Sequence, residues 1–187
     1  MRNRYIFLGA IFFMSCQGSG HHESQVSVAE RKDTGKVVLP EPEIPADNGK
    51  PFFKTTIYKN DKPYVSFEGD YAIALNDANN FNLQLSKSKR MMTVDDYVVL
   101  YFNGIATGDF PIVSSGNEKG RPTLIYTPAT DGVYGIGISA DSGTVHISKY
   151  DAGALSGRLE AYGFDTDSNR FVVKATFINI KNNNLDQ

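Results

Sequence analysis

His146 is the residue best suited to acid–base chemistry in the second half of the chain. Ser148 and Asp151 follow it closely and could serve as partners. A catalytic His needs an orienting acid and a nucleophile, but no Gly-x-Ser-x-Gly turn is present to expose a nucleophile here. We therefore expect an exposed His on a strand and no catalytic role.

Oxygen-bearing side chains alternate along the stretch 165–169, as they do at the start of a calcium-binding loop. Arg170 stands where such a loop needs Gly, and no Glu closes the loop. The same residue types form tight turns between strands without a metal. We expect a turn, with Asp165, Asp167 and Asn169 as weak candidates for metal ligands.

Other acidic residues give weaker indications of catalysis. Asp95 and Asp96 are adjacent, so on a strand their side chains would face opposite ways. A hydrolase could use the dispersed acids Glu68, Asp70 and Glu160 if two of them faced each other about 5 to 10 Å apart. The glycine-rich stretches do not lead into a helix, which a phosphate-binding loop requires. We expect no enzyme activity and no cofactor.

Cys16 is the only cysteine in the chain, and it follows a leader with three parts. Arg2 and Arg4 form a basic start, residues 5–14 are almost entirely apolar, and the small Ser15 precedes the cysteine. This order is typical of a secretory signal peptide. The apolar run is too short to span a bilayer, which takes about 20 residues.

The stretch Phe13-Met-Ser-Cys16 resembles the lipobox of bacterial lipoproteins. The resemblance covers residues 1–16 and implies that residues 1–15 are removed as a lipoprotein signal peptide. The mature chain would then begin at Cys16, with acyl chains on its amino group and its thiol. Several acyl chains give stable anchoring. The implied location is the cell envelope, anchored to the outer membrane and facing the periplasm or the cell surface.

Charge and cysteine content narrow the class of protein. The 19 basic residues, less Arg2 and Arg4, leave 17 against 21 acidic ones, a net charge of about −4 for the mature chain. A nucleic-acid partner would favour a basic surface, so none is expected. A single cysteine allows no disulfide within the chain, so stability must come from a hydrophobic core. We expect one monomeric domain over residues 51–187.

Residues 16–50 are predicted to form a disordered, Pro-rich tether. Residues 17–50 contain no aromatic residue, and four of the eight prolines cluster at or just after the end of this stretch. Such a composition buries too little apolar surface to offset the entropy of ordering. The short apolar island 37–39 could dock as an edge strand. His21 and His22 lack a nearby third ligand, so no metal site is expected there.

The period of the sequence changes to two after residue 51, which is typical of half-buried strands. Residues 81–86 alternate strictly, and the apolar run 97–102 suits a central strand covered on both faces. Turn residues recur at short intervals, including 59–62, 140–143 and 165–169. The pattern predicts an all-β fold, an antiparallel β-sandwich or small β-barrel, with at most one short helix at 86–96.

The C-terminal half is predicted to be a meander of strands at 143–150, 154–164 and 170–180, joined by short turns. The text Gly143-Thr-Val-His-Ile-Ser-Lys-Tyr-Asp151, then Leu155-Ser-Gly157 and a last aromatic strand, is similar to the C-terminal half of small, uncharacterised all-β lipoproteins of Bacteroidota. This resemblance implies the fold and the compartment. It brings no activity with it.

Tyrosine is the most conspicuous candidate for ligand contact, because it offers both apolar area and a hydroxyl. The weak ligand-binding candidates are Tyr126, Tyr134, Tyr150 and Tyr162, although ordinary cross-strand packing would use tyrosine equally well. The sequence thus favours a lipid-anchored envelope protein with a non-catalytic binding or structural domain. Its partner could be a protein, a glycan or an apolar ligand. The alternatives are a lipocalin-like carrier of an apolar molecule and, less favoured, the hydrolase described above.

Overall fold

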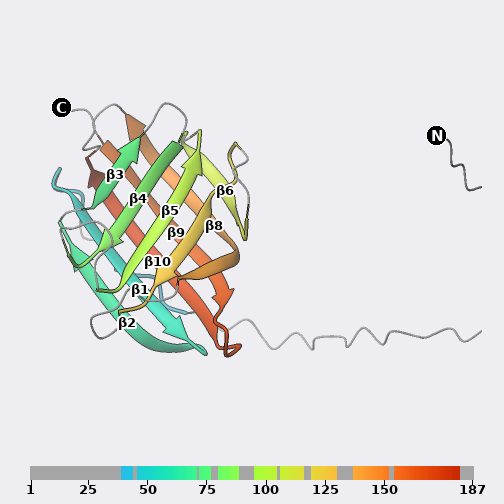
Figure 1. Cartoon of the computed structure of the whole chain (residues 1–187). Coiled ribbons are helices and arrows are strands. Elements are labelled where there is room, and N and C mark those ends of the chain that lie inside the picture. Colours follow the sequence, from blue (N-terminus) through green and yellow to red (C-terminus); the bar gives the residue numbers. More distant parts are fainter. Residues whose placement is uncertain are drawn as a thin grey trace, which may run out of the picture. The chain divides into compact units, whose positions relative to one another are not determined.

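The described part of the chain is entirely strand and connecting segment in a computed structural model (Figure 1). No helix occurs among these residues, and so none there is long and apolar enough to cross a membrane. The all-β prediction is confirmed. The described residues are 39–43, 46–70, 72–76, 80–88, 95–104, 106–115, 119–129, 137–151 and 154–181.

Ten strands make one antiparallel sheet that curls nearly into a barrel (Figure 1). Its strand order is β2-β1-β10-β9-β8-β7-β5-β4-β3, with β6 paired to β8 off this path. Strands β2 and β4 approach each other where the curled sheet comes round. The strands are β1 (Phe52–Lys59), β2 (Lys62–Gly69), β3 (Ile73–Asn76), β4 (Asn80–Ser86), β5 (Tyr97–Asn103), β6 (Gly108–Val113), β7 (Thr123–Thr127), β8 (Ile138–Asp151), β9 (Ala154–Phe164) and β10 (Arg170–Ile180).

The core fills the inside of the curl. Alternate residues of each strand point inward, as Leu159 and Ala161 do on β9 and Phe171 and Val173 do on β10. The side chains between them face outward, and we call this side of the sheet the outer face. The predicted alternation at 81–86 is confirmed, with Phe81, Leu83 and Leu85 all buried in the core.

The tight turn predicted at 59–62 joins β1 to β2. Asn60 and Asp61 adopt φ angles of 51° and 64°, which suits the turn that best matches the twist of a two-residue hairpin. Asn60 Oδ1 also accepts a hydrogen bond from the backbone N–H of Arg170 at 3.0 Å. This turn is therefore tied to the start of β10.

The turn predicted at 140–143 is wrong, because β8 runs without a break through these residues. The register with β9 shifts between Ala140 and Ser142, so these residues form a β-bulge within the strand and not a turn. Gly143 has φ 149°, and a Cβ there would lie 2.3 Å from the carbonyl oxygen of Glu160. On the edge of β8 away from β9, Ile138 and Ser139 pair with β7 and residues 142–147 pair with β6, so this one strand contacts both of them.

A segment ahead of β1 lies on the outer face. We call residues 39–43 and 46–50 the strap. Leu39 is only 7% exposed and packs with Tyr58, Val172 and Tyr162. It belongs to no strand, whereas the sequence left open an edge strand at 37–39. The first part of the predicted tether, residues 16–38, lies outside the described residues.

Candidate functional site

A row of polar side chains crosses the outer face from β2 to β6. Its members are cross-strand neighbours in register on five successive strand pairs. Because register partners share a face of the sheet, they form one continuous surface. We call this surface the polar row, which consists in order of Glu68, Lys54, Thr176, Arg158, His146 and Asp109.

Two hollows open on the outer face along this row. The small hollow has a volume of about 190 Å³ and is lined by row residues together with Glu160 and Lys174 and by Glu41 and Pro42 of the strap. The large hollow, of about 450 Å³, is lined by row residues together with Asp47, Ser148 and Lys149. Both include His146, Arg158 and Thr176, so they adjoin. The large hollow alone is within the range of small-molecule sites, about 300 to 1,000 Å³.

Lys174 forms part of the floor of the small hollow. Its side chain is only 7% exposed, although it lies on the outward side of β10. Its Nζ donates a hydrogen bond of 2.7 Å to the carbonyl oxygen of Leu39 and lies 3.5 Å from Glu160 Oε1. A buried lysine is costly unless it is paired and hydrogen-bonded. The strap and Glu160 together supply those acceptors.

Tyr162 borders this site on the side of the strap. Its hydroxyl donates to Glu160 Oε1, and its ring packs against Leu39 and below the guanidinium of Arg170. Burial, followed by the hydrogen bond and charge of Glu160, raises the pKa of Tyr162 to about 12, although Arg170 acts in the opposite direction. The phenol is therefore a stable hydrogen-bond donor at neutral pH.

His146 and Asp109 form a pair across β8 and β6. His146 Nδ1 lies 2.7 Å from Asp109 Oδ1, and the imidazole is 39% exposed. The sequence suggested Ser148 and Asp151 as partners, but Asp151 instead pairs with Lys149 and accepts a hydrogen bond from Ala154 N–H. The orienting acid was missed because it comes from a strand far away in the sequence.

Arg158 lines both hollows, and its side chain makes only a weak contact with the rest of the described structure. Its side chain is 59% exposed, and its one ion pair among the described residues joins Nη1 to Glu41 Oε2 at 3.9 Å. An exposed pair at that distance contributes little to stability, about 1 kcal/mol or less. The guanidinium can therefore exchange Glu41 for a ligand at small cost.

The tyrosines proposed as ligand contacts are spread over the fold. Tyr126 is buried in the core, where its hydroxyl donates to Asp96 Oδ1 at 2.7 Å and burial raises its pKa. Tyr150 packs edge-on against Phe81 with ring centres 6.4 Å apart. Of the three candidates among the described residues, only Tyr162 contacts a residue that lines the outer-face hollows, Glu160. Asp96 has a structural part in this arrangement, because it also accepts from Ala129 N–H.

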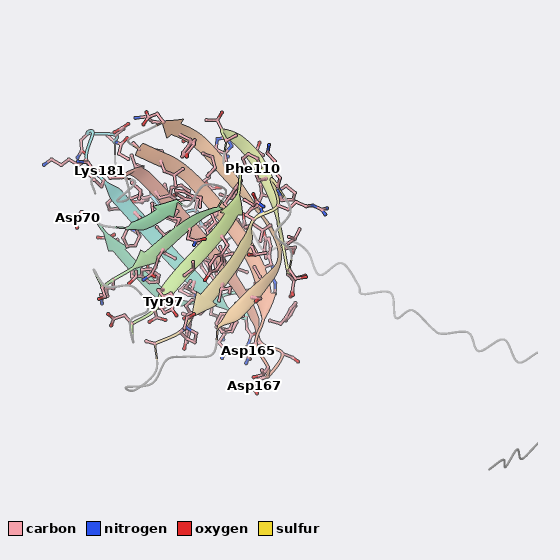
Figure 2. All side chains as sticks on the ribbon, turned by 45° about the horizontal axis from the view of Figure 1, so that its top comes forward. Asp70, Tyr97, Phe110, Asp165, Asp167 and Lys181 are labelled. Carbon is pink, nitrogen blue, oxygen red and sulfur yellow. The ribbon has the colours of Figure 1, made fainter. Side chains whose placement is uncertain are left out.

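The stretch 165–169 forms the turn between β9 and β10 (Figure 2). Asp165 Oδ1 accepts hydrogen bonds from the backbone N–H groups of Asp167 and Asn169 at 3.0 and 2.8 Å. Its Oδ2 accepts from Asn169 Nδ2 at 2.9 Å and lies 3.5 Å from Lys59 Nζ. These donors occupy the oxygens that a metal would need. No group of three metal-ligating residues occurs among the described residues.

The dispersed acids come from two places in the sheet, the end of β2 and the middle of β9. Glu68 is on β2 and pairs with Lys54 of β1, Asp70 follows at the end of β2 (Figure 2), and Glu160 is on β9. Three strand spacings separate β2 from β9 in the sheet. At about 4.8 Å per spacing, the backbones that carry Glu68 and Glu160 are at least about 14 Å apart. That separation exceeds the spacing of a glycosidase carboxylate pair.

One pocket beside core residues is too small for a ligand. A cavity lined by Leu124, Tyr126, Phe171 and other core residues measures about 10 Å³. A single water molecule needs about 10 to 15 Å³ on the same measure. The outer face, and not this part of the core, offers room for a ligand.

Several candidate residues lie outside the described residues: Cys16, His21, His22 and Tyr134. So does most of the candidate helix at 86–96. Comparisons with protein-family models, with curated proteins and with solved structures find no match to this chain.

Proposed function

We propose that this chain is a lipid-anchored protein of the cell envelope whose β domain is a non-catalytic binding module. The observation that carries the binding role is the meeting of Arg158, His146 and Thr176 at two adjoining hollows on the outer face. The ligand would bind on the surface of the sheet. The leader that ends at Cys16 supports the anchor.

The geometry favours this role over an apolar carrier. A lipocalin-like carrier needs an enclosed apolar cavity, whereas the cavity beside Tyr126 and Phe171 measures about 10 Å³. The hollows of the outer face are lined by charged and hydroxyl-bearing side chains instead. A polar molecule suits them better than a lipid chain does.

The hydrolase alternative has weaker support. The backbones that carry its acids Glu68 and Glu160 are at least about 14 Å apart by strand spacing. Asp109 could orient the imidazole of His146 for catalysis, but a hydrolase of this kind would also need a nucleophile beside His146. A binding role needs only the lining that the hollows already have.

The anchor is tested by replacing Cys16 with Ser in the full chain and fractionating the cells. We expect the wild-type protein to stay with membranes through high-salt washing and the Cys16→Ser variant to leave them, because it lacks the lipidated thiol. Ser24→Ala, a change further along the predicted tether, is the matched control and should remain bound. Retention of Cys16→Ser on washed membranes would contradict the anchor.

Binding is tested by native mass spectrometry of the Cys16→Ser chain purified from a bacterial periplasm. We expect a polar molecule to be retained by this chain and lost when Arg158→Ala is added. An apolar molecule retained equally by both chains would contradict the outer-face site and favour the carrier.

A further inference from the structure

We infer that the large hollow binds a small hydroxyl-rich molecule through one oxyanion, a carboxylate or a phosphate, held by Arg158. This inference rests on the proposed function, because it names the ligand class of the same surface.

The two hollows differ in charge. The small hollow sets three basic side chains, His146, Arg158 and Lys174, against three acidic ones, Glu41, Asp109 and Glu160. The large hollow is lined by three basic side chains and a single acidic one. The lining of the large hollow, with Arg158, Lys149 and His146 against Asp47, therefore favours an anion more than that of the small hollow does. Each of these bases also has an acidic partner, Glu41, Asp151 and Asp109 respectively.

The single acid of the large hollow is already occupied. Asp47 Oδ1 accepts hydrogen bonds from Gly49 N–H at 2.9 Å and from Asn179 Nδ2 at 2.8 Å. The bonds from Gly49 and Asn179 lower the pKa of Asp47, the first more strongly. These bonds to Oδ1 hold the strap in place, and the carboxylate supplies the only negative charge in the lining of the large hollow.

The basic groups have capacity left for a ligand. Arg158 gives up only the 3.9 Å contact with Glu41, and its planar fork matches a carboxylate or phosphate with two parallel hydrogen bonds. His146 uses Nδ1 toward Asp109, so Nε2 is the ring nitrogen left to contact a ligand. Lys149 pairs with Asp151 at 3.5 Å, and both side chains are about half exposed.

The remaining lining indicates what carries the oxyanion. Ser148 and Thr176 bring hydroxyls that can both donate and accept, as the hydroxyls of a polyol do. Ile178 adds an apolar side chain to the lining. A volume of about 450 Å³ accommodates a molecule of one or two rings, not a long chain. A small polyol that carries one carboxylate or phosphate therefore matches the lining of the large hollow.

The test is calorimetric titration of the full mature chain carrying Cys16→Ser with three probes of similar size. Glucuronate presents a carboxylate, glucose 6-phosphate presents a phosphate, and glucose presents neither. We expect at least one charged probe to bind at least about tenfold more tightly than glucose, since hydrogen bonds to charged groups are the stronger ones. The tighter of the two charged probes identifies the oxyanion.

The variant Arg158→Gln should weaken binding of that probe by about tenfold or more, and Arg158→Lys should restore part of it because the charge returns without the fork. Lys62→Gln, at an exposed position on β2, is the matched control and should bind as the parent does. Unchanged thermal midpoints would show that each variant is folded.

Equal binding of glucose and the charged probes, or full binding by Arg158→Gln, would overturn the inference while leaving an outer-face binding module intact. Binding of none of the three probes at millimolar concentration would also overturn it. The anchor and the retained-ligand experiments above do not depend on any of these results.

Discussion

Lys174 Nζ donates a hydrogen bond of 2.7 Å to the carbonyl oxygen of Leu39, a residue 135 positions earlier in the chain. The bond joins the strap to β10, which lies inside the sheet between β1 and β9. Glu41 and Pro42, two and three residues further on, line the small hollow. The segment before β1 thus lines part of the candidate site.

Replacing Leu39 by Ala should lower the free energy of unfolding by about 2 kcal/mol. Leu39 is nearly buried against Tyr58 and Val172, and truncation of a buried Leu costs about 2 to 5 kcal/mol, the low end applying where neighbours can close over the gap. Urea unfolding measures the change. Glu43→Ala, at an exposed strap position, should stay within about 0.5 kcal/mol; equal losses for the two variants would contradict the docked strap.

Gly143→Ala should destabilise the protein by at least about 2 kcal/mol, through a backbone conformation that alanine adopts poorly and a clash with its neighbour. The added Cβ would meet the carbonyl oxygen of Glu160 at 2.3 Å. Gly49→Ala is the matched control, because Gly49 has φ 75° and no atom within 4 Å of its Cβ. We expect a cost of about 1 kcal/mol there, measured in the same urea series. A Gly143 variant as stable as the Gly49 variant would refute the bulge.

Tyr162 should make stability depend on pH in the alkaline range. Its folded pKa, about 12, lies above the unfolded value near 10. The contribution of the phenol is therefore complete below pH 10 and is lost as the pH rises toward 12. The difference in tyrosinate absorbance between the parent and Tyr162→Phe should have its midpoint near pH 12, and a midpoint near 10 would contradict the contact with Glu160. Tyr101→Phe, at an exposed position, controls for the loss of one tyrosine.

Calcium should leave the thermal midpoint unchanged, because Asp165 serves the turn between β9 and β10. Partial burial raises the pKa of Asp165. Hydrogen bonds from Asn169 and the charge of Lys59 lower it by more than burial raises it, so the net shift is downward. The stability it gives is present above the unfolded value and is lost as the pH falls through the folded pKa.

Asp165→Ala should accordingly lower the thermal midpoint at neutral pH more than Asp167→Ala, whose backbone N–H alone takes part in the turn. Differential scanning fluorimetry with and without added calcium measures both effects. A rise in midpoint with calcium that disappears in Asp165→Ala would establish a metal site and refute the turn.

The sequence was sufficient for the strands because alternation is a local property. Leu159 and Ala161 point inward and Arg158 and Glu160 outward as their spacing predicts. It was insufficient at 140–143, where Ala, Asp, Ser and Gly have the composition of a turn. Pairing with β9 overrides that composition and keeps the residues in β8. Local preference is a weak guide where a long strand has a fixed partner.

The outer-face site was less predictable, since its contacts join residues far apart in the sequence. Asp109 reaches His146 through the register of β6 on β8, which the sequence alone does not fix. One indication was available at Lys174, the only charged residue in the otherwise mostly apolar stretch 171–177. A lysine at that place needs an acceptor from another element, and Leu39 supplies it.

The attachment of the strap also decides how the domain responds to mechanical force. A pull on the chain from the N-terminal side of Leu39 meets isolated bonds, at Leu39, Pro40 and Asp47, which break one after another. Beyond them β1 is hydrogen-bonded along both edges, to β2 and β10, and takes the load on many bonds together. The strap therefore peels away first, adding about 40 Å of extended chain before the sheet bears tension.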